Sequence, residues 1–296
     1  MVYFFTKQWL GDELMAKKVA ITSDSGCDLF PELYKQYNVG IIPLYINMEN
    51  KSLRDGIEVN PPDIFASVSR TKKIPKTAAP SPADFEALFR PYIEDGFEVV
   101  HISMNSVFSC SYQNADLAAQ EFEGVYVIDS KTLSTAQGLL VIRAVEMARE
   151  GNSAKEIYDY ISSIRHKPFT HFVLDTLEYA YRGGRCSRLT LFGSNLLKLR
   201  ACLAVDAEGI ISVCKKFRGN FPQVALAYAD YMMSQPDIDY SRVFISYTSL
   251  ADAVLHSVIA RIKREKKFKE ILITKTGCTV SCHGGPNTLA IFYMKK

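Results

Sequence analysis

Apolar and polar positions form two kinds of pattern along the first half of the chain. Mostly apolar runs of strand length occur at residues 18–22, 39–48, 97–103 and 125–129. Stretches with helical spacing follow the last two runs, and this pattern ends at Gly151. Apolar strands that alternate with helices are typical of a mainly parallel sheet that is covered on both faces.

Turn and capping residues divide these runs. Residues 31–37 are expected to form a short helix, and Asp55 with Gly56 is expected to form the turn of a short hairpin. Asn60 and Ser81 each precede a proline, which is the arrangement of an N-cap followed by proline in the first helical turn. We therefore expect two further helices to begin at these positions.

The second half, which begins near His166, shows a different order of elements. Asp206 to Gly209 reads as a hairpin turn, so antiparallel pairs are expected beside two or three long helices. The expected strands lie at 169–176, 200–217, 242–248, 270–275 and 289–294. We predict an α/β protein of two domains: residues 15–165 with a mainly parallel sheet and residues 166–296 with a mixed sheet. Residues 1–14 are expected to be an extension.

Composition and motifs exclude several classes of function. The 296 residues are 48% hydrophobic, and 35 basic residues against 32 acidic ones give a net charge of +3, which argues against a nucleic-acid binder. The basic run 261–270 is best explained as a solvated helix face. The chain has no GxGxxG after its first strand, no GxxxxGK[ST] and no HExxH, so dinucleotide, P-loop and zinc-protease sites are not expected.

Cysteine usage and hydropathy indicate a cytosolic protein. The seven cysteines have scattered spacings and no CxxC pair, so we expect reduced thiols. No apolar run approaches the roughly 20 residues that span a bilayer, so no stable membrane insertion is expected. The first 18 residues do not have the form of a signal peptide.

Four polar stretches are candidates for chemistry. They are an expected loop at 76–82 that contains Thr77, the strand-to-helix joint at 109–111, the basic corner 181–185 and the turn 281–287. A helix that begins at the joint leaves N–H groups unpaired, and ligands of open α/β sheets bind beyond the carboxyl ends of strands. Each stretch could bind an anion, or could be an ordinary cap or turn.

One alternative is a serine or cysteine hydrolase or acyltransferase. His283 could act as the base for Ser109 or Cys110, with Asp129 or Asp175 as the acid. The stretch VFSCSYQ lacks the glycines of a GxSxG elbow, and no spacing selects this set of residues.

Taken in order, the motifs resemble the DegV family over roughly residues 17–296. The resemblance is carried by ITSDSGCDL, IIPLYI, Asp55-Gly56, TAAPSP (77–82), SCSYQNA (109–115), VIDSKTLSTAQGLLV, LDTLEYAYRGGR, KKFRG and HGGP (283–286). It implies a two-domain α/β protein that binds one long-chain fatty acid in a tunnel between its domains, without a further cofactor. By this resemblance Thr77, Ser109 and His283 hold the carboxylate, beside Cys110, Ser111 and Gly284. The donors would be hydroxyls, backbone amides or a protonated imidazole.

The resemblance also implies a partner. Some bacterial members present the fatty acid to a separate kinase subunit that forms an acyl phosphate, and Arg218 and Arg182 are the expected docking residues. Ala78, Arg200-Ala201 and Asn287 depart from the family pattern, although asparagine also tolerates a left-handed backbone. A regulatory protein that senses a lipid is a further alternative.

Overall fold

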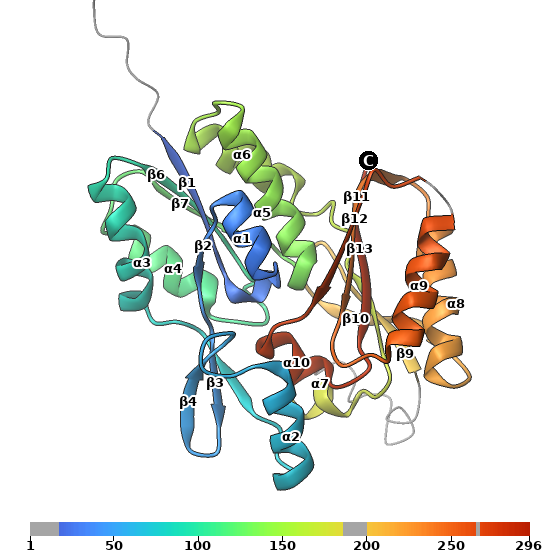
Figure 1. Ribbon diagram of the computed structural model, residues 1–296. Helices are drawn as coiled ribbons and strands as arrows, with labels where there is room; N and C mark the ends of the chain where they lie inside the picture. The colour runs from blue at the N-terminus through green and yellow to red at the C-terminus, as the bar shows by residue number, and fades with distance from the viewer. Residues whose placement is uncertain (1–17, 186–199, 265–266) are drawn as a thin grey trace, which may run out of the picture.

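The computed structural model describes residues 18–185, 200–264 and 267–296. The expected extension at 1–14 lies outside these residues. Figure 1 shows two α/β regions side by side, each with its own sheet. The two-domain α/β fold that the sequence predicted is confirmed, while the boundary between residues 165 and 166 stays a prediction. Within the described residues, no helix has the length and apolar character needed to cross a membrane.

The N-terminal region contains a four-stranded parallel sheet in the order β2-β1-β6-β7. Helices α3 and α4 cover one face, and α1, α5 and α6 cover the other. The strands are β1 (Val19–Asp24), β2 (Gly40–Ile42), β6 (Glu98–Ser103) and β7 (Val125–Asp129). The helices are α1 (Pro31–Tyr37), α3 (Pro82–Glu94), α4 (Ser111–Ala119), α5 (Ser134–Arg149) and α6 (Ala154–Ile164). A short 3₁₀ turn, η1 (Ser25–Cys27), follows β1.

A second, antiparallel sheet in this region corrects the expected strand at 39–48. That run is divided into β2 and β3 (Tyr45–Met48), which belong to different sheets. The break lies at Pro43, which has no N–H to donate to a strand ladder. Leu44 then donates its backbone N–H to the Ser25 hydroxyl oxygen at 3.0 Å instead of continuing the strand.

The hairpin in this region also differs from the expectation. β3 pairs with β4 (Lys51–Arg54) through Glu49 and Asn50, whose φ angles of 51° and 61° suit a tight turn between antiparallel strands. Asp55, expected in the turn, is buried. The expected loop around Thr77 is β5 (Lys76–Ala78), because this segment pairs with β3. Helix α2 (Pro61–Thr71) lies between β4 and β5 in the chain, and Asn60 is its N-cap, as predicted.

The C-terminal region contains a mixed six-stranded sheet in the order β10-β9-β8-β13-β11-β12. β11 and β12 are parallel, and the other neighbours are antiparallel. The strands are β8 (His171–Leu174), β9 (Arg200–Val205), β10 (Ile211–Phe217), β11 (Ile238–Tyr247), β12 (Glu270–Lys275) and β13 (Leu289–Lys295). The predicted turn at Asp206 to Gly209 joins β9 to β10, with a φ of 85° at Gly209.

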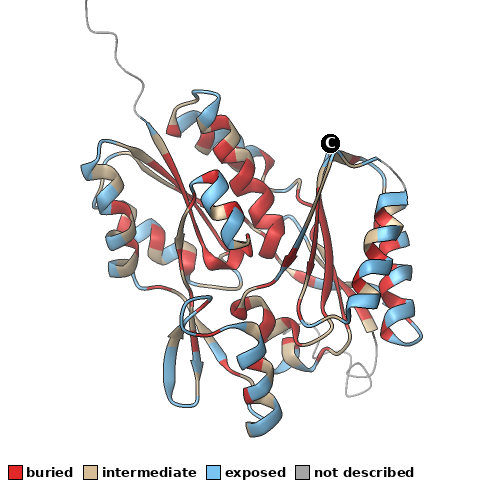
Figure 2. Ribbon diagram, viewed as in Figure 1, coloured by how far each residue is buried: buried red, intermediate tan, exposed pale blue. Residues whose placement is uncertain are grey.

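Helices α8 (Phe221–Met233) and α9 (Asp252–Arg264) cover the outer face of this sheet, and α5 lies against the other face. Figure 2 shows α5 as largely buried, and most of its side chains are removed from solvent. A helix that is buried all round lies inside a core, and here Leu140 and Ile142 share one apolar cluster with Phe244 and Phe292 of the C-terminal sheet. The two regions therefore have a common core.

Two short helices complete the contact between the regions. α7 (Glu178–Arg182) follows β8, and α10 (Cys278–Gly284) follows β12. α10 contacts α7 of its own region, and also α2, β3 and β5 of the N-terminal region. Residues at the end of α10 are consequently placed beside the small antiparallel sheet.

Candidate functional site

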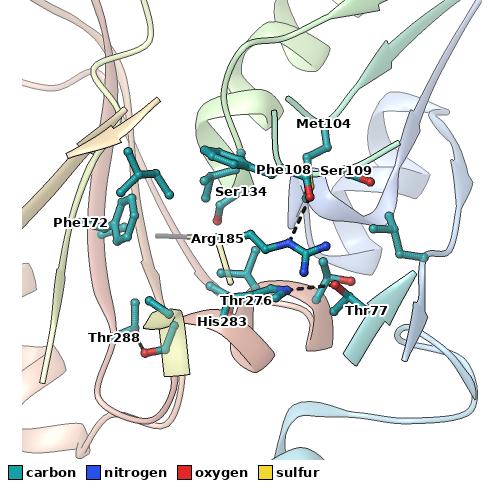
Figure 3. A pocket seen from close by; sticks show the side chains of 18 of the residues that line it. Thr77, Met104, Phe108, Ser109, Ser134, Phe172, Arg185, Thr276, His283 and Thr288 are labelled. Carbon is teal, nitrogen blue, oxygen red and sulfur yellow. Dashed lines mark hydrogen bonds between the residues drawn. The ribbon is translucent and has the colours of Figure 1, made fainter. Parts of the chain in front are cut away.

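A cavity of about 260 Å³ lies between the two regions. Its volume is near the lower end of the roughly 300–1,000 Å³ found for small-molecule sites. Both regions contribute apolar walls, among them Leu44, Met104, Phe108, Phe172, Ile211 and Phe292. Figure 3 shows Thr77, Ser109, Arg185 and His283 converging at one end of this cavity, with Phe172 at the opposite side. The cavity is thus mostly apolar, with its charged group and its imidazole at one end. Five further hydroxyl side chains line it, and each is hydrogen-bonded within the protein: Ser134, Ser246, Thr276, Thr279 and Thr288.

Thr77 and His283, both predicted site residues, meet at this polar end. Thr77 lies on β5 and His283 in the last turn of α10. The Thr77 Oγ1 and His283 Nε2 atoms are 3.0 Å apart, which is a hydrogen-bond distance (Figure 3). The pair joins residues 206 positions apart in the sequence, so only the fold brings it together.

The imidazole of His283 is neutral at pH 7. Burial, assisted by the positive charge of Arg185, lowers the pKa of His283 to about 4. These surroundings favour the neutral imidazole over the protonated form that was named among the expected donors. Nδ1 is buried without a hydrogen-bond partner in the described chain. A proton on Nε2 leaves no buried donor unpaired, and Thr77 then accepts from His283 and keeps its own O–H proton for a ligand.

Two buried aspartates, Asp28 and Asp55, hold the first turn of α10, and burial raises the pKa of Asp28 to about 8. Asp28 Oδ1 accepts from the Gly277 N–H at 2.7 Å. The Asp55 carboxylate accepts from the N–H groups of Cys278 at 2.8 Å and Thr279 at 3.0 Å. Carboxylates are favourable at helix N-termini because N–H groups there are unpaired and carry partial positive charge. These contacts fix α10, and with it His283, against the N-terminal region.

The joint between β6 and α4 supplies the next polar group. α4 begins at Ser111, as predicted, and the Ser109 hydroxyl oxygen accepts from the Ser111 N–H at 3.1 Å. Ser109 and Cys110 both line the cavity. Ser111 does not, because its hydroxyl donates to the buried Asp24 carboxylate at 3.0 Å. The structure thus gives Ser111 a supporting contact in place of the predicted ligand contact.

Arg185 is the residue of this site that sequence reasoning missed. It lines the exposed rim of the cavity, where its guanidinium donates to the backbone oxygens of Phe108 at 3.2 Å and Gly183 at 3.0 Å. Within the described ranges, no acidic side chain forms an ion pair with it. The basic corner 181–185 was the available signal, but spacing did not show which arginine faces inward.

The two predicted docking arginines lie elsewhere. Arg182 donates to the Glu178 carboxylate at 2.9 Å and to the Lys72 backbone oxygen at 3.0 Å. Arg218 is exposed just after β10. Neither lines the cavity, which is consistent with, but does not test, a role in docking.

Glycines allow the close approach of α7 and α10. A Cβ atom on Gly183 would come within 2.4 Å of His283 Nδ1. Gly284, a predicted ligand contact, lines the cavity and accepts from the Thr288 hydroxyl at 2.8 Å. Asn287 adopts a left-handed φ of 54°, as expected for an asparagine that replaces glycine.

The hydrolase alternative is not assembled in the structure. His283 Nε2 contacts Thr77, and neither candidate acid reaches the imidazole. Asp129 pairs with Lys131 at 2.7 Å, and Asp175 pairs with Arg200 at 2.7 Å. Across the described residues, no group of three or more His, Cys, Asp or Glu side chains is placed to hold a metal ion.

Comparisons with known proteins agree with this architecture. A DegV domain-containing protein of Caldanaerobacter subterraneus is 31% identical over 95% of this chain and its own full length. A DegV family protein from Thermus thermophilus, described as fatty-acid binding, is 28% identical with a TM-score of 0.86 over 94% of this chain and 100% of its own. The fatty acid kinase B3 protein of Streptococcus pneumoniae, loaded with linoleic acid, is 22% identical over 94% of this chain and 100% of its own, with a TM-score of 0.80, which shows a shared fold. The family model described as "Uncharacterised protein, DegV family" matches residues 18–296, and the chain belongs to the DegV family.

Proposed function

We propose that this protein binds one long-chain fatty acid in the cavity between its two regions. The observation that carries the proposal is the combination of mostly apolar walls with one end where Thr77, Ser109, Arg185 and His283 meet. A fatty acid has the same division between its hydrocarbon tail and its carboxylate. The Thermus thermophilus relative, described as fatty-acid binding, supports the same ligand class.

The polar end offers a charge and several donors to a carboxylate. Arg185 supplies the positive charge, Thr77 and Ser109 supply hydroxyls, and Cys110 supplies a backbone N–H at the start of α4. Each hydrogen bond to a charged group contributes about 1.5–3 kcal/mol. In this arrangement His283 stays neutral and orients the Thr77 hydroxyl, so it affects the ligand through Thr77. Gly284 shapes the wall beside it.

The hydrocarbon tail supplies most of the affinity. Burial of a methylene group contributes about 0.8 kcal/mol, so a chain of about fourteen methylenes gains roughly 11 kcal/mol before ordering costs. The head-group contacts then select the orientation and replace the water that the carboxylate loses. Such a site needs no activated nucleophile, so we infer a carrier and not an enzyme.

We further propose that the carrier is cytoplasmic and presents its ligand to a separate kinase subunit. The fold shared with the Streptococcus pneumoniae fatty acid kinase B3 protein supports this possibility at the level of architecture. Arg218 and Arg182 are exposed and would contact that partner. The substitution Arg218→Glu should lower partner-dependent phosphorylation of the bound acid while fatty-acid affinity is unchanged. Unchanged phosphorylation would remove Arg218 from the docking surface.

The first experiment is extraction of the purified protein. The protein is denatured, extracted with organic solvent, and the extract is analysed by mass spectrometry. We expect about one fatty acid per chain, which would also reveal the preferred chain length. An empty extract, together with no uptake of added oleate or palmitate, would overturn the proposed function.

A further inference from the structure

A second polar cluster lies on the other face of the C-terminal sheet. Cys202 is in β9 and Cys214 is in β10, and the two strands are antiparallel. Val213 pairs with Leu203 and Lys215 pairs with Cys202, so an irregularity in β10 places both Cys214 and Lys215 opposite Cys202. Two cysteines on neighbouring antiparallel strands are thereby brought side by side.

The two thiols lie close together. The Cys214 thiol donates to the backbone oxygen of Cys202, with its Sγ atom 3.3 Å from that oxygen, and the Cys202 thiol donates to the Leu203 backbone oxygen at 3.8 Å. Cys202 is buried in the core beneath α8, whereas Cys214 is exposed to solvent. Neither forms a disulfide in this structure. The Cys214 thiol is therefore accessible to solvent, and the Cys202 thiol is buried next to it.

Polar groups from β8 and α8 surround the exposed thiol. His171 and Tyr231 both contact the Cys214 sulfur. His171 Nδ1 is buried and has no hydrogen-bond partner in the described chain. The neighbouring Cys202 thiol and the His171 side chain lower the pKa of Cys214, and the neighbouring Cys214 thiol together with burial raises the pKa of Cys202. Lys215 is the nearby cation.

We propose that Cys214 is a site of oxidation by small hydroperoxides and that Cys202 then closes a disulfide with it across β9 and β10. An exposed thiol beside a histidine and a second thiol is the arrangement of an oxidant-sensitive cysteine with its resolving partner. Cys214 is the extra residue at the irregularity opposite Cys202, and neighbouring strands lie about 4.8 Å apart, which is within the range of Cα separations found in disulfides. The proposal is independent of fatty-acid binding, because the cluster lies on the α8 face of the sheet and not in the cavity.

The chemistry balances in two steps. The Cys214 thiolate attacks the terminal oxygen of the hydroperoxide, the O–O bond breaks, and protonation of the leaving oxygen gives an alcohol, or water from hydrogen peroxide. The sulfur is oxidised by two electrons to a sulfenic acid, and the peroxide is reduced. The Cys202 sulfur then attacks the sulfenic sulfur, and hydroxide leaves with the Cys202 proton as water.

Mass spectrometry after hydrogen peroxide treatment tests the proposal directly. Trypsin should release residues 201–215 as one peptide that contains both cysteines. After treatment with slight excess peroxide and blocking of free thiols, we expect this peptide to be unblocked and lighter by two hydrogen atoms. Cys110, which is also exposed, serves as the internal control and should remain largely blocked. Equal oxidation of Cys110 and Cys214, or Cys214 oxidised without a disulfide, would overturn the proposal.

Variants separate the roles of the two thiols. In Cys202→Ser, dimedone should trap a sulfenic acid on Cys214, and in Cys214→Ser the peptide should show neither product. The rate of alkylation by iodoacetamide gives a readout that does not depend on disulfide formation. Between pH 8 and pH 6 we expect the reaction of Cys214 to slow much less than that of an ordinary thiol with a pKa near 8.5, which slows roughly 75-fold. A pH dependence like that of glutathione, measured in parallel, would contradict the assigned role.

Discussion

Two histidines in different regions of the molecule each have a buried Nδ1 without a hydrogen-bond partner among the described residues. His283 lies between the Thr77 hydroxyl and the cation of Arg185. His171 lies beside the thiol of Cys214 and the ring of Tyr231, on the other side of the C-terminal sheet. The two imidazoles therefore have different surroundings, with a hydroxyl and a cation at one and a thiol and an aromatic ring at the other.

The comparison shows how the neighbours at each site favour one charge state, neutral for the His283 imidazole and negative for the Cys214 thiol. At the cavity, a positive neighbour and burial both disfavour the imidazolium, so the positive charge belongs to Arg185 and remains available to an anion. At the thiol pair, the neighbouring Cys202 thiol and His171 lower the pKa of Cys214 and so favour a negative charge on it. A carboxylate is expected at the first place, and an oxidant at the second.

The largest effect is expected from the loss of Asp55, which supports the helix that carries His283 and not the strand that carries His171. Asp55→Ala leaves the N–H groups of Cys278 and Thr279 and the Thr279 hydroxyl without their acceptor in a buried site. We expect the free energy of unfolding in urea to fall by about 3–5 kcal/mol. His171 lies on a strand, so Cys214 should keep its alkylation rate in the folded protein.

Asp63→Ala is the matched control for this change. Asp63 also caps a helix, through the Asn60 N–H at 3.0 Å, but it is exposed. Its loss should cost about 1 kcal/mol. Equal losses in the two variants would show that Asp55 has no special part in holding α10.

The neutrality of His283 predicts a pH dependence. Its pKa is lowered to about 4 in the fold from about 6.5 in the unfolded chain, so its stabilising contribution is complete above pH 6.5 and is lost as the pH falls toward 4. The full contribution is about 3 kcal/mol. His283→Gln should therefore lose less unfolding free energy than the unchanged protein between pH 7 and about pH 4.5. Parallel pH profiles for the two proteins would contradict a neutral His283.

Arg185 and Arg182 together test which positive charge contacts the ligand. Arg185→Gln removes the cation at the cavity, and we expect the dissociation constant for oleate to rise about 10–100-fold, which corresponds to about 1.5–3 kcal/mol. Arg182→Gln removes an equal charge three residues away, from a side chain that contacts Glu178 and Lys72. Isothermal titration of both variants should show a change in the first only. Equal weakening would point to a general effect of surface charge.

The smallest effect is expected from removal of the Thr77 hydroxyl. Thr77→Val keeps the shape of the side chain but removes the group that His283 orients toward the ligand. We expect oleate binding to weaken about fivefold, which is the value of one hydrogen bond near 1 kcal/mol. Thr71→Val, on α2, removes a hydroxyl that bonds only locally, to the Ser67 backbone oxygen and the Lys73 N–H, and should bind oleate normally. Unchanged binding in Thr77→Val would remove this hydroxyl from the head-group site.

Local features of the fold were predicted correctly where the signal lies within a few residues. Asn60 and Ser81 begin helices, and Asp206 to Gly209 forms the predicted hairpin. The parallel and mixed sheets follow from the order of apolar runs. Thr77, Ser109 and His283 were selected by resemblance, and the structure brings them to one cavity, although ligand contact stays a prediction.

Caps, turns and apolar periodicity act over short distances, so most strands and helices, and the polar stretches at their ends, could be predicted without the structure. The split of 39–48 into β2 and β3 could not, because it depends on pairing with distant strands. The directions of the side chains also depend on tertiary contacts. Ser111 turns to Asp24, Arg185 and not Arg182 reaches the cavity, and Thr77 lies on a strand because β3 pairs with it. The contact of Cys202 with Cys214 likewise depends on strand register. Such contacts are set by partners far away in the chain, whose positions exist only once both regions share one core.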